Sequence, residues 1–137
     1  MSKPTPDTIA EREKTSPFTN PNPAYTFAEY QTNAVRTLNR DLGSFNMHLV
    51  DCALGITGES GEVAEAVKHY LARTHEMCAE NGEQEFRNKI KRELGDILWY
   101  IASTCELMGW DLSEVALANN HKLYLRHGDA FSGHGLR

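Results

Sequence analysis

Apolar residues recur every three to four positions through most of this chain, which is the spacing of an amphipathic helix. Four stretches follow that spacing and are expected to be helices: residues 25–42, 46–73, 86–110 and 111–128. No stretch alternates apolar and polar residues with the period of two that marks a half-buried strand. The pattern therefore predicts an all-α fold similar to a four-helix bundle.

The ends of the expected helices carry their own signals. Thr26 is placed to cap the first helix, and Gly109 is placed to end the third in a left-handed turn. Asp111 and Glu114 have the spacing of a capping box at the start of the fourth helix. Proline, which interrupts helices, does not occur after residue 23. These signals agree with the boundaries that the apolar spacing predicts.

The segment GESGEVAEAVKHY, residues 58–70, combines two features that weaken a helix. Gly58 and Gly61 each cost about 1 kcal/mol relative to alanine, and glutamates at a spacing of three repel one another. The stretch is therefore compatible with one helix, or with two that break near Gly55 or Gly58. Glycines also remove side chains, and we interpret Gly58 and Gly61 as allowing a ligand or another helix to approach closely.

The composition divides the 137 residues into three parts. Residues 1–24 hold all five prolines and are expected to be a flexible tail, residues 25–128 to be the helical domain, and residues 129–137 to be a glycine-rich tail. The chain has neither a bilayer-spanning apolar run nor a signal-peptide pattern, so we expect a cytoplasmic protein without a membrane partner. A net charge of −5 argues against binding a nucleic acid polymer, which needs a basic face.

The three cysteines are Cys52, Cys78 and Cys105. They form no Cys-x-x-Cys pair and are odd in number, so they do not suggest a zinc site or a set of disulfides. We expect reduced thiols that are mostly buried.

Two pairs of acidic residues have the spacing that places each pair on one helix face. Glu59 and Glu62 lie three positions apart in the second helix, and Glu93 and Asp96 lie three positions apart in the third. Because each pair flanks apolar positions, packing of the two helices can bring four carboxylates together. Four such groups repel one another strongly unless a cation lies among them. Either pair alone is more often a solvated helix face, but the neighbouring glycines favour a metal site.

The ligand chemistry narrows the choice of metal. A set of oxygen ligands suits Mg²⁺, Mn²⁺ or Ca²⁺ rather than zinc or copper. Carboxylate di-iron bundles use Glu-x-x-His on two of their helices, and no glutamate here is followed by histidine three residues later. We therefore predict Mg²⁺ as the cofactor, with Mn²⁺ able to substitute for it.

Residues 53–70 (ALGITGESGEVAEAVKHY) and the segment that begins IKRELGDILWY at residue 90 closely resemble the MazG-type all-α nucleoside triphosphate pyrophosphohydrolases. That family carries Glu-x-x-Glu on one helix and Glu-x-x-Asp on the next, and these motifs correspond here to Glu59, Glu62, Glu93 and Asp96. Its last helix carries Asn, Lys and Arg spaced by three and then four, which correspond to Asn119, Lys122 and Arg126. The resemblance covers roughly residues 26–133, and the segment between the two acidic motifs is longer here than is usual in the family.

The resemblance implies a reaction, the hydrolysis of a ribo- or deoxyribonucleoside triphosphate between its α and β phosphates. The four carboxylates would be the catalytic residues and would hold the Mg²⁺. One of them, for which we favour Glu62, would take the proton of the attacking water. Asn119, Lys122 and Arg126 would bind the phosphates of the substrate, with Lys68 as a further candidate.

The second and third helices are more apolar than a lone bundle requires, and family members resemble bundles completed by a neighbouring subunit. We therefore expect a homodimer or homotetramer. Trp99 and Tyr100 are interpreted as core or interface aromatics rather than as groups that stack on a base. Two alternatives remain open: a dimeric dUTPase-like hydrolase that is strict for uracil, and a non-catalytic helical interaction module.

Overall fold

The structure, a computed structural model, describes residues 16–18, 24–72 and 82–127. Within these ranges the helical elements are α2 (Phe27–Ala34), the 3₁₀ turn η1 (Val35–Thr37), α3 (Phe45–Ala72), α4 (Gly82–Met108) and α5 (Leu112–Arg126). The same residues contain no β-strand, so the all-α prediction is confirmed. Most of the predicted N-terminal tail and all of residues 129–137 lie outside the described ranges.

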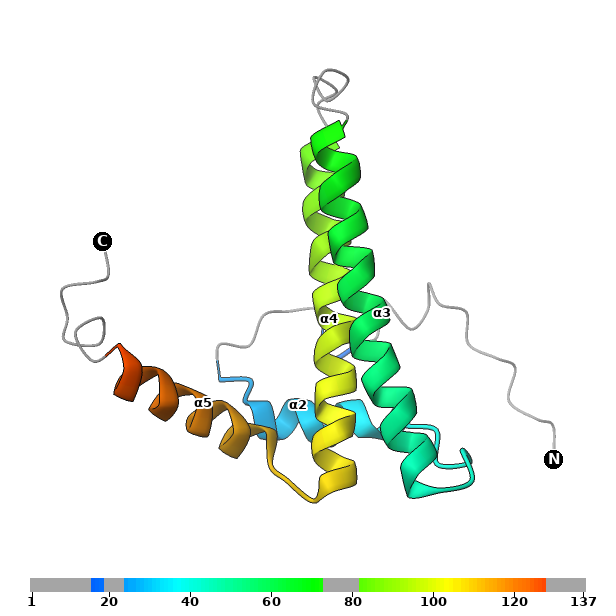
Figure 1. The fold of residues 1–137 in the computed structure, drawn as a ribbon, viewed down its shortest axis with the longest axis vertical. Helices are drawn as coiled ribbons and strands as arrows, with labels where there is room; N and C mark the ends of the chain where they lie inside the picture. The colour runs from blue at the N-terminus through cyan, green and yellow to red at the C-terminus, as the bar shows by residue number, and fades with distance from the viewer. Residues whose placement is uncertain (1–15, 19–23, 73–81, 128–137) are drawn as a thin grey trace.

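Helices α3 and α4 form a long antiparallel pair, α2 crosses α4 near its lower end, and α5 leads away from that end (Figure 1). Among the described elements, α3 packs against α4 only, whereas α4 also contacts α2, η1 and α5. Within the described residues, therefore, one side of α3 is covered by α4 and no other element packs on that helix. No helix in the described part of the chain is both long and apolar enough to cross a bilayer.

Helix α3 is continuous through Gly55, Gly58 and Gly61. Of the two possibilities that the sequence left open, the single helix is therefore correct. The helix begins after Ser44, whose hydroxyl accepts a hydrogen bond from the Met47 N–H at 3.3 Å. That hydroxyl satisfies one of the backbone donors that a helix N-terminus leaves without a partner inside the helix.

Two of the predicted helix ends are confirmed. The Thr26 hydroxyl accepts the N–H of Glu29, and the Glu29 carboxylate accepts the N–H of Thr26 at 2.8 Å, which completes a capping box at the start of α2. At the end of α4, Gly109 has a φ of 69°. The Trp110 N–H then donates to the Cys105 carbonyl at 2.9 Å, as in a Schellman motif.

The start of α5 differs from the prediction. Asp111 is the N-cap residue, but its side chain makes no capping hydrogen bond, so the capping box predicted for Asp111 and Glu114 is wrong. The buried side chain of Gln31 in α2 takes over this role. Its Oε1 accepts the N–H of Leu112 at 2.7 Å, and its Nε2 donates to the Trp110 carbonyl at 2.9 Å. A side chain from another helix thus fixes the turn between α4 and α5.

The core is small and lies where α2, α4 and α5 meet. Its buried members are Ala102, Cys105 and Leu112, with partly buried Tyr30, Ala34, Leu98 and Ile101 packed around them. The Trp99 indole N–H donates to the Ala34 carbonyl at 3.1 Å and to the Thr37 hydroxyl at 2.8 Å, which agrees with its interpretation as a core aromatic. Cys52 and Cys105 are buried free thiols as predicted, and Cys78 lies outside the described residues.

Candidate metal centre

Three of the four predicted carboxylates meet between α3 and α4. Glu59 comes from α3, and Glu93 and Asp96 come from α4. One oxygen from each carboxylate lies within 4.8 Å of the others. Glu93 is buried, Glu59 is half-buried and Asp96 is exposed, so the group opens to solvent on one side. We call these three residues the carboxylate cluster.

A close helix contact lies one turn away from the carboxylate cluster. Tyr100 follows Asp96 by four residues on α4, and Gly55 precedes Glu59 by four residues on α3, so each lies on the same helix face as its cluster neighbour. A Cβ atom on Gly55 would overlap the Tyr100 ring. The absence of a side chain at Gly55 therefore lets the ring lie directly against the backbone of α3.

Burial and the neighbouring acidic groups raise the affinity of Glu59 for a proton. Partial burial raises the pKa of Glu59, and the negative charges of Asp96, Glu93 and Glu62 raise it further. The pKa of Tyr100 is raised as well, first by burial and then by nearby acidic groups that include Asp51 and Glu59. The phenol therefore stays protonated beside the cluster at neutral pH.

The chemistry of the cluster fits a hard divalent cation. Its three candidate ligand atoms are carboxylate oxygens that lie within 4.8 Å of one another. Such oxygens are the preferred ligands of Mg²⁺ and Mn²⁺. Among the described residues, Arg92 contacts the cluster: its Nη2 lies 3.7 Å from Glu93 Oε1, and the Arg92 side chain is largely exposed. A divalent ion would neutralise the negative charges that, after burial, raise the pKa of Glu59.

Glu62, the fourth predicted carboxylate, is not part of the carboxylate cluster. It lies one turn after Glu59 on α3, and its Oε2 is 3.7 Å from Nζ of Lys89 on α4. Its negative charge still contributes to the raised pKa of Glu59. The structure therefore brings Glu62 beside the cluster, with its carboxylate turned toward a lysine.

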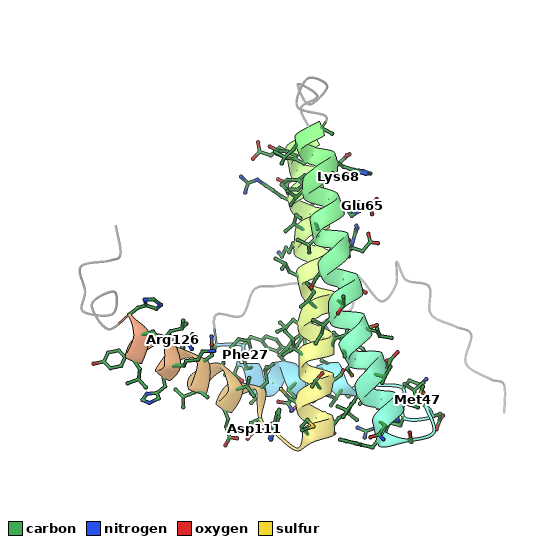
Figure 2. The ribbon with its side chains drawn as sticks, viewed as in Figure 1. Phe27, Met47, Glu65, Lys68, Asp111 and Arg126 are labelled. Atoms are coloured by element: carbon green, nitrogen blue, oxygen red, sulfur yellow. The ribbon has the colours of Figure 1, made fainter. Side chains whose placement is uncertain are left out.

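The predicted phosphate-binding residues lie away from the carboxylate cluster within one chain. Asn119, Lys122 and Arg126 are exposed on α5, and Arg126 is at the end of α5 that is farthest from α3 and α4 (Figure 2). Lys68 is exposed on α3, nine residues after Glu59, which corresponds to roughly 13 Å along a helix axis. None of these four residues contacts the cluster in the described part of a single chain, and their roles stay predictions.

Sequence reasoning missed two residues that border the cluster. Lys89 precedes Glu93 by four residues, a spacing that places both on one face of α4 and that was available as a signal. Gly55 was considered only as a possible break in α3. By contrast, Cβ atoms at Gly58 and Gly61 would meet no described atom within 4 Å. The close approach expected at those two glycines occurs instead at Gly55 within one chain.

The part of the chain that carries these residues matches a known family. Residues 51–131 match the family described as the MazG nucleotide pyrophosphohydrolase domain. The Gene 37 protein of Mycobacterium phage L5 is 36% identical over 73 residues, which are 53% of this chain and 60% of the phage protein. The match thus spans less than two thirds of that relative's length. No solved structure matches the chain.

Proposed function

The chain belongs to the MazG nucleotide pyrophosphohydrolase domain family, and from this premise we propose that it hydrolyses nucleoside triphosphates between the α and β phosphates. The products are a nucleoside monophosphate and pyrophosphate. The observation that carries the proposal is the carboxylate cluster of Glu59, Glu93 and Asp96, drawn from two helices within the matched residues. A group of carboxylates this close together attracts a divalent cation, and a triphosphate needs such a cation to approach acidic residues.

We propose Mg²⁺ as the cofactor, with Mn²⁺ as a substitute. Glu59, Glu93 and Asp96 would hold the ion, and Glu62 is the fourth candidate ligand. Such an ion supplies charge neutralisation for the phosphate oxygens and lowers the pKa of a bound water. The chain's own contribution is to fix the spacing of the carboxylates through the packing of α3 on α4.

Glu62 has two proposed roles that an experiment can separate. As the acceptor of the proton from the attacking water, it would affect turnover far more than the affinity for the cation. As a ligand of the cation, it would affect that affinity directly. Measuring both quantities for Glu62→Gln therefore assigns its role.

We propose that the active form is a homodimer or homotetramer. The support is the apolar surface exposed on the described helices: Leu54 is 68% exposed, Leu117 is 70% exposed and Leu125 is 71% exposed. A hollow of about 570 Å³ along α3 and α4 is also mainly apolar, with Val67, Ile90 and Leu94 among its lining residues. Exposed apolar surface of this extent is typical of subunit interfaces. In such an assembly, Asn119, Lys122 and Arg126 would act on the carboxylate cluster of a neighbouring subunit.

Light scattering after size-exclusion chromatography tests the assembly directly. A dimer or tetramer at micromolar concentration is the expected result. A monomer that hydrolyses nucleotides at full rate would contradict the proposal that a neighbouring subunit completes the site.

Product analysis tests the reaction. The protein is incubated with each ribo- and deoxyribonucleoside triphosphate in the presence of Mg²⁺, and the products are identified by chromatography. Pyrophosphate released from several nucleotides supports the proposal. Hydrolysis of dUTP alone supports the dUTPase-like alternative, and no hydrolysis supports a non-catalytic interaction module.

Substitutions in the carboxylate cluster test its part in that reaction. Glu59→Gln and Asp96→Asn should abolish turnover, because each removes a negative charge that would hold the cation. Both variants should keep the helical circular dichroism spectrum, since the substitutions preserve side-chain shape. Wild-type rates in both variants would show that the cluster is not the metal site.

A further inference from the structure

Gln31 is a buried polar side chain that ties the start of α5 to another helix. It lies on α2 and is 8% exposed. Its Oε1 accepts the Leu112 N–H at 2.7 Å, and its Nε2 donates to the Trp110 carbonyl at 2.9 Å. The side-chain amide therefore holds the backbone on both sides of Asp111, the N-cap residue of α5.

Most of α5 lies on the surface of the described chain. Among the described elements, α5 contacts only α2 and α4. Its first residue, Leu112, is buried in the core, but the rest of the helix is exposed apart from the half-buried Ala116 and Leu123. Figure 1 shows α5 leading away from the pair of α3 and α4. The helix is thus anchored mainly at its N-terminal end, where Gln31 makes its two hydrogen bonds.

The direction of α5 at Leu112 decides where its far end lies. Asn119 is seven residues beyond Leu112, and Arg126 is fourteen residues beyond it, which corresponds to about 10 Å and about 21 Å along the helix axis. A rotation of α5 by about 10° at Leu112 would therefore displace these positions by about 2 Å and about 4 Å. The donor–acceptor distances of good hydrogen bonds vary by only about 0.5 Å, so such a rotation would break a contact that Arg126 makes.

We propose that Gln31 is a positioning residue: by holding the turn at Leu112, it orients α5 so that Lys122 and Arg126 reach the phosphates of the substrate. The inference rests on the proposed function, in which these residues bind a triphosphate at the carboxylate cluster of a neighbouring subunit. The two hydrogen bonds of Gln31 go to the backbone of the turn between α4 and α5. Gln31 therefore acts on the substrate through the direction of a helix.

A side chain from another helix suits this role better than a local cap does. Asp111 is exposed, and its side chain makes no capping hydrogen bond. A cap supplied by Asp111 would satisfy N–H groups of α5, but it would move together with that helix. Gln31 belongs to α2, which packs on α4. Its hydrogen bonds therefore fix α5 relative to the helix that carries Glu93 and Asp96 of the carboxylate cluster.

Triphosphate binding to Gln31→Met tests the proposal, with Thr37→Val as the matched control. Methionine keeps the length of the side chain and removes both hydrogen bonds. Thr37→Val also keeps the side-chain shape, and it removes the 2.8 Å bond from the Trp99 indole N–H to the Thr37 hydroxyl, which does not involve α5. Gln31→Met should weaken the binding of inorganic triphosphate in saturating Mg²⁺ by about tenfold or more. Thr37→Val should change it by less than about twofold.

Two further measurements show whether the effect is confined to α5. Mn²⁺ affinity should stay within about twofold of wild type in both variants, because the carboxylate cluster lies on α3 and α4. Gln31→Glu keeps the acceptor for the Leu112 N–H and loses the donor to the Trp110 carbonyl, so its triphosphate affinity should lie between those of wild type and Gln31→Met. A loss of Mn²⁺ affinity as large as the loss of triphosphate affinity would contradict an action through α5.

Coupling between Gln31 and Arg126 distinguishes orientation from a general loss of stability. Side chains more than about 10 Å apart that share no partner normally contribute independently. Arg126→Met should weaken triphosphate binding about tenfold or more in the parent chain, because a charged donor is lost. The same substitution should have much less effect in Gln31→Met, where Arg126 is already displaced, and its full effect in Thr37→Val. An equal effect in the parent and Gln31→Met chains would overturn the proposal, as would wild-type triphosphate affinity in Gln31→Met.

All variants are compared in the same assembly. Titration calorimetry measures triphosphate affinity, and electron paramagnetic resonance measures Mn²⁺ affinity, at a protein concentration at which light scattering gives each variant the wild-type mass. A Gln31→Met protein that does not assemble at any concentration would also overturn the proposal, since Gln31 would then act on assembly rather than on the direction of α5.

The outcome also separates this inference from the proposed function. A wild-type protein that binds triphosphate with Mg²⁺ but releases no pyrophosphate from nucleotides would contradict the reaction, and the same binding series would still decide the role of Gln31. An active wild-type protein in which Lys122→Met and Arg126→Met leave triphosphate affinity unchanged would overturn the role of α5 and with it that of Gln31. The proposed reaction would stand in that case.

Discussion

Gly55 is the position in α3 at which the structure leaves no room for a side chain. A Cβ atom there would overlap the Tyr100 ring, whereas Cβ atoms at Gly58 and Gly61 would meet no atom of another described element within 4 Å. All three glycines lie inside the same continuous helix. Substituting alanine therefore changes the same intrinsic helix preference at each position, but it changes packing at Gly55 alone.

The effect of each alanine substitution on stability depends on the magnitudes of the helix preference and of the packing cost. Alanine stabilises a helix interior by about 0.8–1.0 kcal/mol relative to glycine. An extra methyl group forced into a filled space costs about 1–3 kcal/mol. We therefore expect Gly58→Ala to raise the free energy of unfolding by about 1 kcal/mol. Gly55→Ala should lie about 1–3 kcal/mol below Gly58→Ala, because the intrinsic preference cancels in that comparison.

Urea unfolding followed by far-UV circular dichroism measures this difference, with all variants at one protein concentration because an oligomer's stability depends on concentration. Tyr100→Ala supplies the control background. Without the ring, Gly55→Ala should stabilise the chain as Gly58→Ala does. Equal stabilities of the two alanine variants in the parent chain would refute the packing argument, and so would a difference that survives in the Tyr100→Ala background.

Two further predictions concern stability. Gln31→Ala should lower the free energy of unfolding by about 1–3 kcal/mol, because it leaves the Leu112 N–H without its acceptor. As a control, Thr32→Ala at the neighbouring, exposed position should change that free energy by less than about 0.5 kcal/mol in the same urea titration. In metal-free protein, the raised pKa of Glu59 means that the folded state binds this proton more tightly than the unfolded state does. The contribution of Glu59 to stability should therefore fall as pH rises above the ordinary value of 4.5, and thermal unfolding of wild type and Glu59→Gln across pH should show this difference. Added Mg²⁺ should remove most of it at neutral pH, and identical pH profiles for the two proteins would contradict the prediction.

The sequence predicted those features of the fold that depend on residues close together in the chain. The spacing of apolar residues predicted four helices, but the first, expected over residues 25–42, ends at Ala34 and is followed only by the 3₁₀ turn to Thr37. Thr26 and Gly109 marked two of the helix ends. The pairing of Glu93 with Asp96 in the cluster also followed from a spacing of three. Each of these features is decided within one or two helical turns, where geometry is fixed by the helix itself.

Features that depend on the register between α3 and α4 were not predictable from spacing. Gly55 and Gly58 are equivalent as helix-weakening residues, and only the position of the Tyr100 ring makes one of them necessary. Lys89 is one of two lysines on α4, and although its spacing from Glu93 places it on the same helix face, only its distance from Glu62 shows that it pairs across the two helices. The cap of α5 was missed for the same reason, because its acceptor, Gln31, comes from a distant helix.

The carboxylate cluster lies between two contacts that differ in kind. On one side the Tyr100 ring lies against the backbone at Gly55, and on the other the ion pair between Lys89 and Glu62 joins the helices through flexible side chains. A packed ring resists displacement, whereas an exposed ion pair yields to a competing charge. Spacing of the carboxylates therefore depends mainly on the aromatic contact, and the ion pair is free to rearrange.

It follows that Gly55→Ala should weaken Mn²⁺ binding by separating Glu59 from Asp96, in addition to its effect on unfolding. Gly58→Ala should leave Mn²⁺ affinity unchanged, although Gly58 is closer in sequence to Glu59. If Gly55→Ala destabilised the fold and yet bound Mn²⁺ with wild-type affinity, the aromatic contact would have no part in setting the metal site.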